Sequence, residues 1–236
     1  MQYIVALLLI GFVILAHEFG HFIAARIVGV PIKTFSIGFG PKLWAVKKKG
    51  TEYRIAMIPL GGYVMPDVED DKEFLALPLY KRIVMTAGGP LASVILPLFC
   101  FALVNCISTG ISLNGLFVKP FHQTYLIFSG VGVSLLGIFS QHSQLSGIIG
   151  VVAQGGKFIG VSFVKALQFA GLISLNLAVL NLVPLPVLDG GKILLYLMEG
   201  VHPKFSKLHY PLAIAGWVLV MGLMLYATAI DIVRLT

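Results

Sequence analysis

Charged residues are scarce in this chain of 236 residues, and cysteine is almost absent. Only 11% of the residues are charged and 58% are hydrophobic, whereas soluble proteins contain roughly 25% charged residues. The two cysteines, Cys100 and Cys106, lie in one apolar run, so a structural disulfide is not expected. The shortage of charge excludes an intrinsically disordered chain, and the shortage of cysteine excludes a small disulfide-stabilised secreted domain. The composition is that of a membrane protein.

The sequence also lacks internal repeats, low-complexity tracts and any linker that would separate two soluble domains. We therefore expect a single membrane-embedded domain over residues 1–236. The net charge of +7 is no sign of nucleic-acid binding, because the basic residues cluster between apolar stretches, where they set the orientation of a membrane protein. We expect a lipid bilayer around the chain and no nucleic-acid partner.

Four stretches are long and apolar enough to cross a bilayer, which takes about 20 mostly apolar residues in a helix. They are residues 3–28, 83–107, 165–183 and 211–233. The first stretch lacks the basic head and the Ala-x-Ala cleavage site of a signal peptide, so we expect it to be retained. The expected fold is an all-α polytopic membrane protein with four transmembrane helices.

Basic residues are distributed unevenly between these stretches. Ten of the 17 Lys and Arg residues lie between Arg26 and Arg82, whereas residues 109–160 contain only two. Because cytoplasmic loops of membrane proteins carry an excess of Lys and Arg, the first and third loops are expected in the cytoplasm and the second outside.

The first loop has the pattern of a β-hairpin. Residues 43–46 and 52–58 flank a turn at residues 48–51 that contains Gly50. We expect a small membrane-associated hairpin or sheet in this cytoplasmic loop. If residues 52–58 form an exposed strand, they could bind an extended substrate by adding it to the sheet; the alternative is a surface element that only packs.

Residues 121–139 compete as a fifth span. An apolar residue recurs there at every fourth position: Ile127, Val131, Leu135 and Phe139. This spacing is typical of a helix that lies on a membrane or packs on a bundle. We expect an interfacial helix between the second and third spans.

The clearest chemical signal is His17-Glu18-Phe19-Gly20-His21 in the first span. Residues four apart lie on one face of a helix, so both imidazoles could hold one zinc ion while Glu18 contacts its water as general base. Ionisable side chains inside a membrane span usually mark function. The alternative is that these three groups hydrogen-bond to neighbouring helices and hold the bundle together.

A catalytic zinc ion usually has three protein ligands, and Asp189 is the best candidate for the third. It follows Pro184 and Pro186, which break the third span and free backbone that must line a cavity or be buried. With four spans, the first and third run in the same direction, so Asp189 reaches the face where His21 lies. A fifth span would carry it to the opposite face. Other possible ligands are expected to be solvated, structural or on the outer side: Glu199, His202, His209, His122 and His142.

At these residues the chain resembles the site-2 proteases, which are intramembrane zinc metalloproteases, and among them the bacterial RseP type. The resemblance rests on residues 17–21, 35–41, 59–63, 88–90, 145–147 and 176–191. It implies that His17, His21 and Asp189 bind zinc, that Glu18 is the general base, and that Asn176 and Asn181 hold substrate. The alternative for the two asparagines is a hydrogen bond between helices.

The resemblance further implies regulated intramembrane proteolysis in a bacterial inner membrane, with the active site toward the cytoplasm. Substrates would be single-span membrane proteins, such as anti-sigma factors, or remnant signal peptides. One departure is plain: the stretch between the second and third spans is too short for the PDZ domains of the RseP type plus the helix at 121–139.

Two other functions compete with a protease. A metal-binding or metal-transporting membrane protein would carry ionisable residues along a path through the bilayer, whereas the second and fourth spans hold few apart from Asp231. An inactive protease-like scaffold would have lost part of the motif. The complete set of Glu18, two histidines and Asp189 favours the protease.

Overall fold

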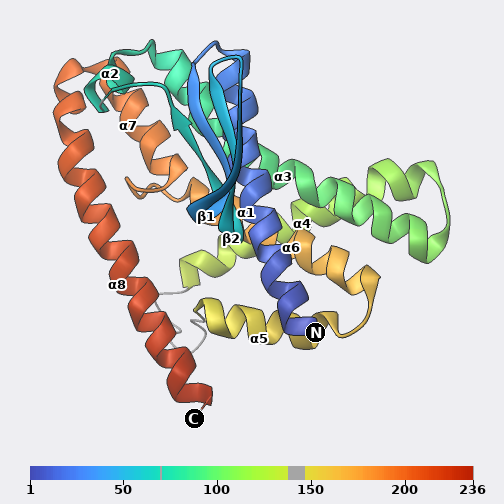
Figure 1. Ribbon diagram of the computed structural model, residues 1–236. Coiled ribbons are helices and arrows are strands. Elements are labelled where there is room, and N and C mark those ends of the chain that lie inside the picture. Colours follow the sequence, from blue (N-terminus) through green and yellow to red (C-terminus); the bar gives the residue numbers. More distant parts are fainter. Residues whose placement is uncertain (70, 138–146, 236) are drawn as a thin grey trace.

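The computed structural model describes residues 1–69, 71–137 and 147–235 (Figure 1). In chain order the elements are α1 (Gln2–Ile27), β1 (Ile32–Lys48), β2 (Thr51–Pro66), α2 (Asp71–Ala76), α3 (Leu79–Thr109), a π-helix η1 (Asn114–Val118), α4 (Lys119–Gly137), α5 (Ile148–Ile159), α6 (Phe163–Leu182), α7 (Asp189–Val201), a 3-10 helix η3 (Pro203–Leu208) and α8 (His209–Leu235). The molecule is therefore mostly helical, with one small antiparallel sheet after the first helix.

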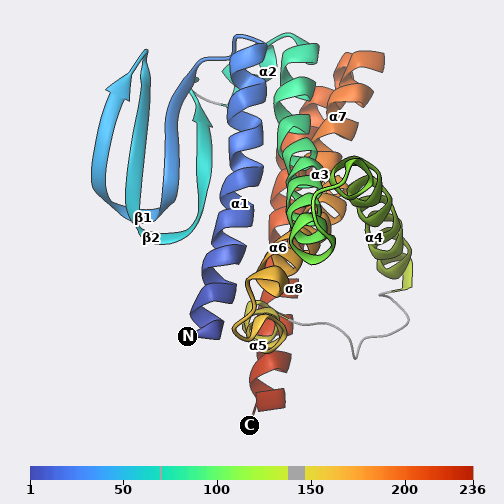
Figure 2. The same cartoon turned by 90° about the vertical axis from the view of Figure 1, so that its right-hand side faces the viewer.

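Four helical segments of the described chain are long and apolar enough to span a membrane: Gln2–Ile27, Leu79–Thr109, Phe163–Leu182 and Lys204–Asp231. They correspond to the four predicted spans, which are confirmed. The segment that competed as a fifth span forms α4, which is not apolar enough to join this group. Instead α4 packs against α3 and α6 (Figure 2). The last two residues of its predicted range, 138 and 139, lie outside the described residues.

Glycines set the contact between α1 and α3. A Cβ atom on Gly20 would collide with the carbonyl oxygen of Gly88, and one on Gly88 would collide with the carbonyl oxygen of Gly20. Small residues at such crossings let membrane helices approach until their backbones touch. The two helices are therefore held together at the level of the His17–His21 motif.

The sheet contains two long strands, each bent so that it pairs twice. Thr34 pairs with both Met65 and Glu52, and Ile55 pairs with both Ile37 and Trp44. The predicted hairpin is confirmed, since Lys48 pairs with Thr51 across its turn. The predicted exposure of residues 52–58 is wrong over 52–55, because the first half of β1 covers their second side.

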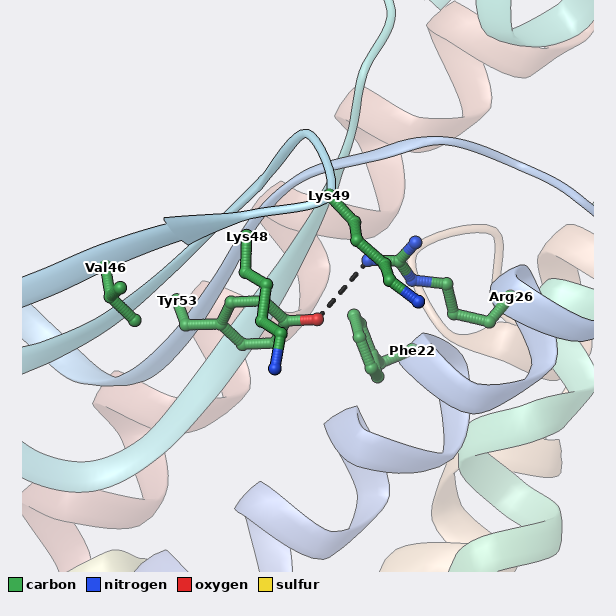
Figure 3. A pocket seen from close by; sticks show the side chains of 6 residues that line it. All are labelled: Phe22, Arg26, Val46, Lys48, Lys49 and Tyr53. Atoms are coloured by element: carbon green, nitrogen blue, oxygen red, sulfur yellow. Dashed lines mark hydrogen bonds between the residues drawn. The ribbon is translucent and has the colours of Figure 1, made fainter.

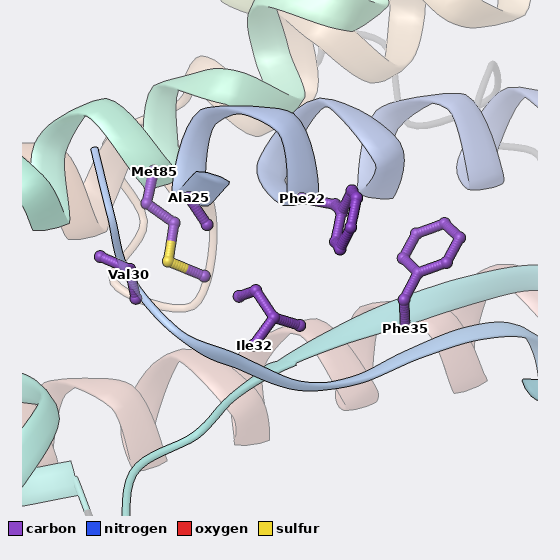
Figure 4. Close-up of a cluster of buried hydrophobic side chains, with 6 residues drawn as sticks. All are labelled: Phe22, Ala25, Val30, Ile32, Phe35 and Met85. Atoms are coloured by element: carbon purple, nitrogen blue, oxygen red, sulfur yellow. The ribbon is translucent and has the colours of Figure 1, made fainter. Parts of the chain in front are cut away.

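Aromatic packing fastens the sheet to the last turns of α1 (Figure 4). The cluster consists of Phe22, Ala25, Val30, Ile32, Phe35 and Met85. The rings of Phe22 and Phe35 lie 5.0 Å apart between centroids. Full burial of a side chain of this size contributes roughly 1.5–3 kcal/mol. The sheet is thus fixed beside the turns of α1 that carry the His17–His21 motif.

The last helix, α8, keeps large apolar side chains exposed along its length, among them Trp217 and Leu225. An exposed apolar surface of this kind suits contact with lipid. Near its end, however, Asp231 is buried, and its carboxylate accepts a hydrogen bond of 2.8 Å from the backbone N–H of Gly150. That N–H lies in the first turn of α5, where backbone donors have no partner within the helix. The contact ties α8 to the rest of the bundle.

Candidate metal centre

Three side chains from distant parts of the chain meet between α1 and the start of α7. The Nε2 atoms of His17 and His21 lie 3.3 Å apart, and Asp189 Oδ2 lies 3.1 Å from the first and 3.3 Å from the second. The three ligand atoms lie within 4.8 Å of one another. The structure therefore brings together the three residues that the sequence predicts as metal ligands.

Asp189 reaches this point because the chain turns back after α6. The helix ends at Leu182, and backbone hydrogen bonds from Leu185 to Val183 and from Leu188 to Leu185 shape the turn. The first turn of α7 lies so close to this backbone that a Cβ on Gly190 would meet Leu182, and one on Gly191 would meet Leu185. The two glycines after Asp189 are therefore required by packing.

The other nitrogen of each imidazole is held by α3. His17 Nδ1 lies 2.9 Å from Ser93 Oγ, and His21 Nδ1 lies 2.9 Å from the backbone oxygen of Met85. Because a carbonyl oxygen only accepts, the contact with Met85 favours a proton on Nδ1 of His21, so Nε2 is the nitrogen that would bind a metal. Metal-binding histidines are oriented in this way by a partner on the second nitrogen. Sequence spacing did not reveal Ser93 or Met85.

Gly89 leaves the space that the two imidazoles occupy. A Cβ atom at this position would collide with Nε2 of His21 and come within 2.6 Å of Nε2 of His17. In the sequence alone, the Gly88-Gly89-Pro90 stretch is notable only for its resemblance to the site-2 proteases. Its physical role is now visible: Gly88 allows the helix contact, and Gly89 allows the histidines to converge.

The site fits a cation. Burial raises the pKa of the Asp189 carboxyl, but the facing imidazoles of His17 and His21 outweigh burial and hold this pKa well below its usual range. The buried carboxylate of Asp189 and the Nε2 atoms of both histidines thus converge on one point, where a positive charge would be favourable. Two histidines and one carboxylate are a common donor set for catalytic zinc.

Glu18 lies half-buried on α1 beside this group. Its carboxylate interacts electrostatically with His21, His17 and Asp189. Within the described residues it has no hydrogen-bond partner, so its oxygens are available to a water molecule or a substrate.

The predicted substrate residues are not part of the cluster. Asn176 Nδ2 donates a hydrogen bond of 2.9 Å to the Leu172 oxygen of its own helix. Asn181 is half-buried, and its side chain has no hydrogen bond to the described part of the chain. It lies one residue before Leu182, which packs on Gly190 beside Asp189. Their role in substrate binding stays a prediction.

The alternative ligands are engaged elsewhere. Glu199 binds Arg82 through two contacts of 2.8 Å and lies 3.1 Å from His209 Nε2. His202 accepts a hydrogen bond from the backbone of Lys204. His122 is exposed on α4, and His142 lies outside the described residues. Those alternative ligands that lie in the described part of the chain thus have structural or surface positions, as expected.

The chain is similar to proteins whose names describe zinc metalloproteases. A protein of Campylobacter jejuni, provisionally named a zinc metalloprotease, is 26% identical over 99% of this chain and 94% of its own length. A similarly named protein of Clostridium acetobutylicum is 24% identical over 98% of the chain and 97% of its own length. A Helicobacter pylori protein with such a name is 53% identical, but over 30% of the chain and 21% of its own length.

The first two alignments are longer than this chain, so those relatives carry residues without a counterpart here. The short connection between α3 and α6 fits the expected lack of a PDZ domain, since its described residues form η1, α4 and α5. The profile of peptidase family M50 matches residues 5–225. Together with its four apolar helices, this match shows that the chain is a multi-pass membrane protein of peptidase family M50, the zinc-dependent site-2 protease family.

Proposed function

We propose that this protein is an intramembrane zinc metalloprotease that hydrolyses peptide bonds within or near transmembrane segments. The observation that carries the proposal is the position of the His17–His21–Asp189 group. His17 lies ten residues before the end of α1, which is about 15 Å along a helix that rises 1.5 Å per residue. A buried site at that depth would be accessible to substrate segments that lie within the membrane.

His17, His21 and Asp189 would hold the zinc ion. When bound, zinc polarises the peptide carbonyl and makes water acidic enough to attack it near neutral pH. Glu18 would take the proton from the attacking water and later deliver it to the leaving nitrogen. The hydrogen bonds on Nδ1 of both histidines keep the imidazoles in place during these proton transfers.

The substrate must present an extended backbone, because a transmembrane helix hides its carbonyl groups in internal hydrogen bonds. The strand edge at Gly62–Met65 is suited to receive it. This segment pairs with Thr34–Ile37 on one side, and no strand of the described chain pairs with its other side. Gly61 packs against Ile14 of α1, so the edge runs beside the helix that carries Glu18. Binding by strand addition is therefore proposed at this edge rather than at residues 52–58.

Asn181 is proposed to donate its side-chain amide to the extended substrate or to the developing oxyanion. Asn176 is proposed to support the substrate from the same helix. The expected substrates are single-span membrane proteins, such as anti-sigma factors, or remnant signal peptides. The proposed location is the bacterial inner membrane with the site toward the cytoplasm, because the first loop carries most of the basic residues.

Metal transport is a weaker candidate. Two buried ionisable residues near the ends of described spans both have protein partners. Arg82 of α3 binds Glu199, and Asp231 of α8 binds the start of α5. Neither one extends a path from the His17–His21–Asp189 group through the bilayer.

Cleavage of a single-span test substrate by the purified protein in detergent tests the proposed activity. We expect one zinc per chain, and cleavage that stops with a chelator and returns with added zinc. Absence of cleavage by the zinc-loaded protein would contradict the proposal.

Photo-crosslinking tests the proposed strand edge. A photoreactive residue at Met65, on the proposed edge, should capture the substrate in the Glu18→Gln background. The same residue at Trp44, which is also exposed but lies on the opposite edge of the sheet, is the matched control. Equal capture at both positions would overturn binding at the Gly62–Met65 edge.

A further inference from the structure

A second, basic cavity lies between the end of α1 and the turn of the hairpin (Figure 3). Its volume is about 590 Å³, within the range of ligand pockets, which is about 300–1,000 Å³. It is lined by Phe22, Arg26, Val46, Lys48, Lys49 and Tyr53. Three of these six residues are cationic and none is acidic. The cavity is separate from the metal centre, and the proposed protease mechanism does not use it.

Arg26 is held in place at one wall of this cavity. Its Nη2 donates hydrogen bonds to Thr51 Oγ1 at 2.7 Å and to Tyr53 Oη at 3.3 Å, and its guanidinium lies 5.2 Å from the centre of the Phe22 ring. Thr51 is buried and donates to the backbone oxygen of Ile32. Both recorded bonds of Arg26 use one nitrogen, so the remaining N–H donors are available to a ligand.

The two lysines reach the cavity from the hairpin turn. Figure 3 shows the Lys49 side chain directed toward Phe22 and Arg26, and the Lys48 side chain passing the Tyr53 ring in this view. Lys49 has a positive φ of 49°, a conformation that glycine or asparagine adopts with less strain. Strain at a residue that is not glycine often accompanies function. Within the described chain neither lysine, nor Arg26, forms an ion pair, since Glu52 pairs with Lys42 instead.

The cavity adjoins the end of a helix that is long and apolar enough to span a membrane, and headgroups lie near the ends of such helices. Phe22 and Arg26 belong to the last turns of the spanning helix α1, so they lie about 8 Å and 2 Å before its end at Ile27. Val46 and the neighbouring Trp44 are exposed apolar residues on the same strand. A ligand there meets three positive charges beside an apolar, aromatic wall.

We propose that this cavity binds the phosphate headgroup of an anionic phospholipid. The phosphate oxygens accept hydrogen bonds from Arg26, Lys48 and Lys49, while the rings of Phe22 and Tyr53 contact the glycerol and the first methylene groups. Basic pockets at the membrane surface recognise such headgroups. A bound lipid bridges the hairpin turn to α1 and thereby fixes the sheet at the membrane surface. A soluble phosphate would gain nothing from the apolar wall, and this favours a lipid.

Native mass spectrometry of the full chain in detergent, titrated with phosphatidylglycerol or phosphatidylcholine, tests the proposal. We expect phosphatidylglycerol to bind at least about tenfold more tightly, and the double variant Lys48→Gln/Lys49→Gln to lose this preference. The matched control is Lys33→Gln/Lys47→Gln, which removes the same charge from exposed positions of the same sheet that do not line the cavity. The control should bind within about twofold of the unmodified chain. Lys48→Arg/Lys49→Arg should retain binding.

Each contrary result identifies another explanation. Equal losses in the two glutamine variants would show general attraction to charge and overturn a built site. Displacement of the lipid by inorganic phosphate at equal concentration would assign the cavity to a small soluble anion. An acidic peptide that binds through Lys48 and Lys49 while phosphatidylglycerol does not would assign it to a protein segment. Thermal unfolding of all variants checks that each one is folded, and the lipid readout does not depend on protease activity.

Discussion

The two ends of α7 hold the same kinds of side chain in opposite situations. At its start, Asp189 Oδ2 faces Nε2 of His17 and His21, and the partly exposed Lys192 reaches only the other oxygen, Oδ1, at 4.0 Å. Near its end, Glu199 faces His209 at 3.1 Å, but here the buried guanidinium of Arg82 binds both carboxylate oxygens at 2.8 Å. Arg82 also stacks on Tyr196 at 4.9 Å. A carboxylate beside histidine is thus suited to hold a metal or forms a structural ion pair, depending on whether a buried protein cation binds it at hydrogen-bond distance.

Asp189→Ala, at the start of α7, is expected to have the largest effect on zinc binding and activity. We expect this change to remove zinc and activity together, because it deletes a ligand from a site that needs three. Metal content by mass spectrometry and cleavage of the single-span substrate measure both effects. If zinc stays stoichiometric, the third ligand lies elsewhere, and Glu199 or His202 becomes the better candidate.

Glu18→Gln separates catalysis from metal binding. Cleavage should fall by about 10²–10⁴-fold, the usual contribution of a general base. Zinc content and the unfolding temperature should stay close to those of the unmodified chain, because the carboxylate serves the water and not the metal. Unchanged turnover would remove Glu18 from the mechanism.

Glu199→Gln tests the other end of α7. We expect a loss of about 3 kcal/mol of stability, since the buried Arg82 loses its charged partner. Zinc content should remain at one per chain. Denaturation in detergent followed by tryptophan fluorescence measures the first effect, and metal analysis the second. Zinc loss from the folded variant would mean that the two ends of α7 are not independent.

Ser93→Ala tests whether the hydrogen bonds around the proposed metal ligands contribute to zinc affinity. The hydroxyl holds His17 Nδ1 at 2.9 Å, and partners of this kind usually change metal affinity about 10–100-fold. We expect weaker zinc binding in competition with a chelator and a small change in stability. Ser174→Ala is a suitable comparison, because Ser174 Oγ contacts the Ser93 backbone and not the imidazole. Equal effects of the two changes would point to general packing.

The smallest expected effect is a pH dependence. The hydrogen bonds from Arg82 lower the pKa of Glu199 below its ordinary value of 4.5, although burial opposes them. A carboxyl group whose pKa falls on folding adds stability that is fully present above its ordinary pKa and lost as pH falls through the lower, folded value. The unfolding temperature should therefore decline below about pH 4.5 in the unmodified chain and less steeply in Glu199→Gln. Parallel curves would contradict the assignment.

Local spacing was enough to predict part of the site. His17 and His21 share a face because they are four residues apart on one helix. Asp189 was predicted less directly, from the count of spans and the prolines before it. The sequence therefore singled out the three residues that the structure brings together, while the contacts of Ser93, Met85 and Gly89 with the imidazoles were not predicted. Those contacts join residues more than 60 positions apart, which no local pattern records.

The sheet also shows that local sequence patterns do not predict contacts between distant residues. The turn near Gly50 was readable, because a turn of this kind depends on a few adjacent residues. The pairing of Thr34 with Glu52 was not, because it requires the first strand to bend at Gly38 and Gly40, both with positive φ. Those glycines in residues 35–41 were the available signal. Because this bend was not predicted, residues 52–58 were wrongly expected to form the exposed strand edge.

By itself, the sequence determined the four spans, the helical pair of histidines and the family to which the chain belongs, because hydropathy and helical period act over short stretches. The sequence also predicted that Asp189 lies beside those histidines, but only the tertiary structure decided that Arg82 neutralises Glu199 and which strand edge stays free. These outcomes depend on distances between helices and on strand register. Both are set by contacts such as Gly20 on Gly88, whose partners lie far apart in the chain.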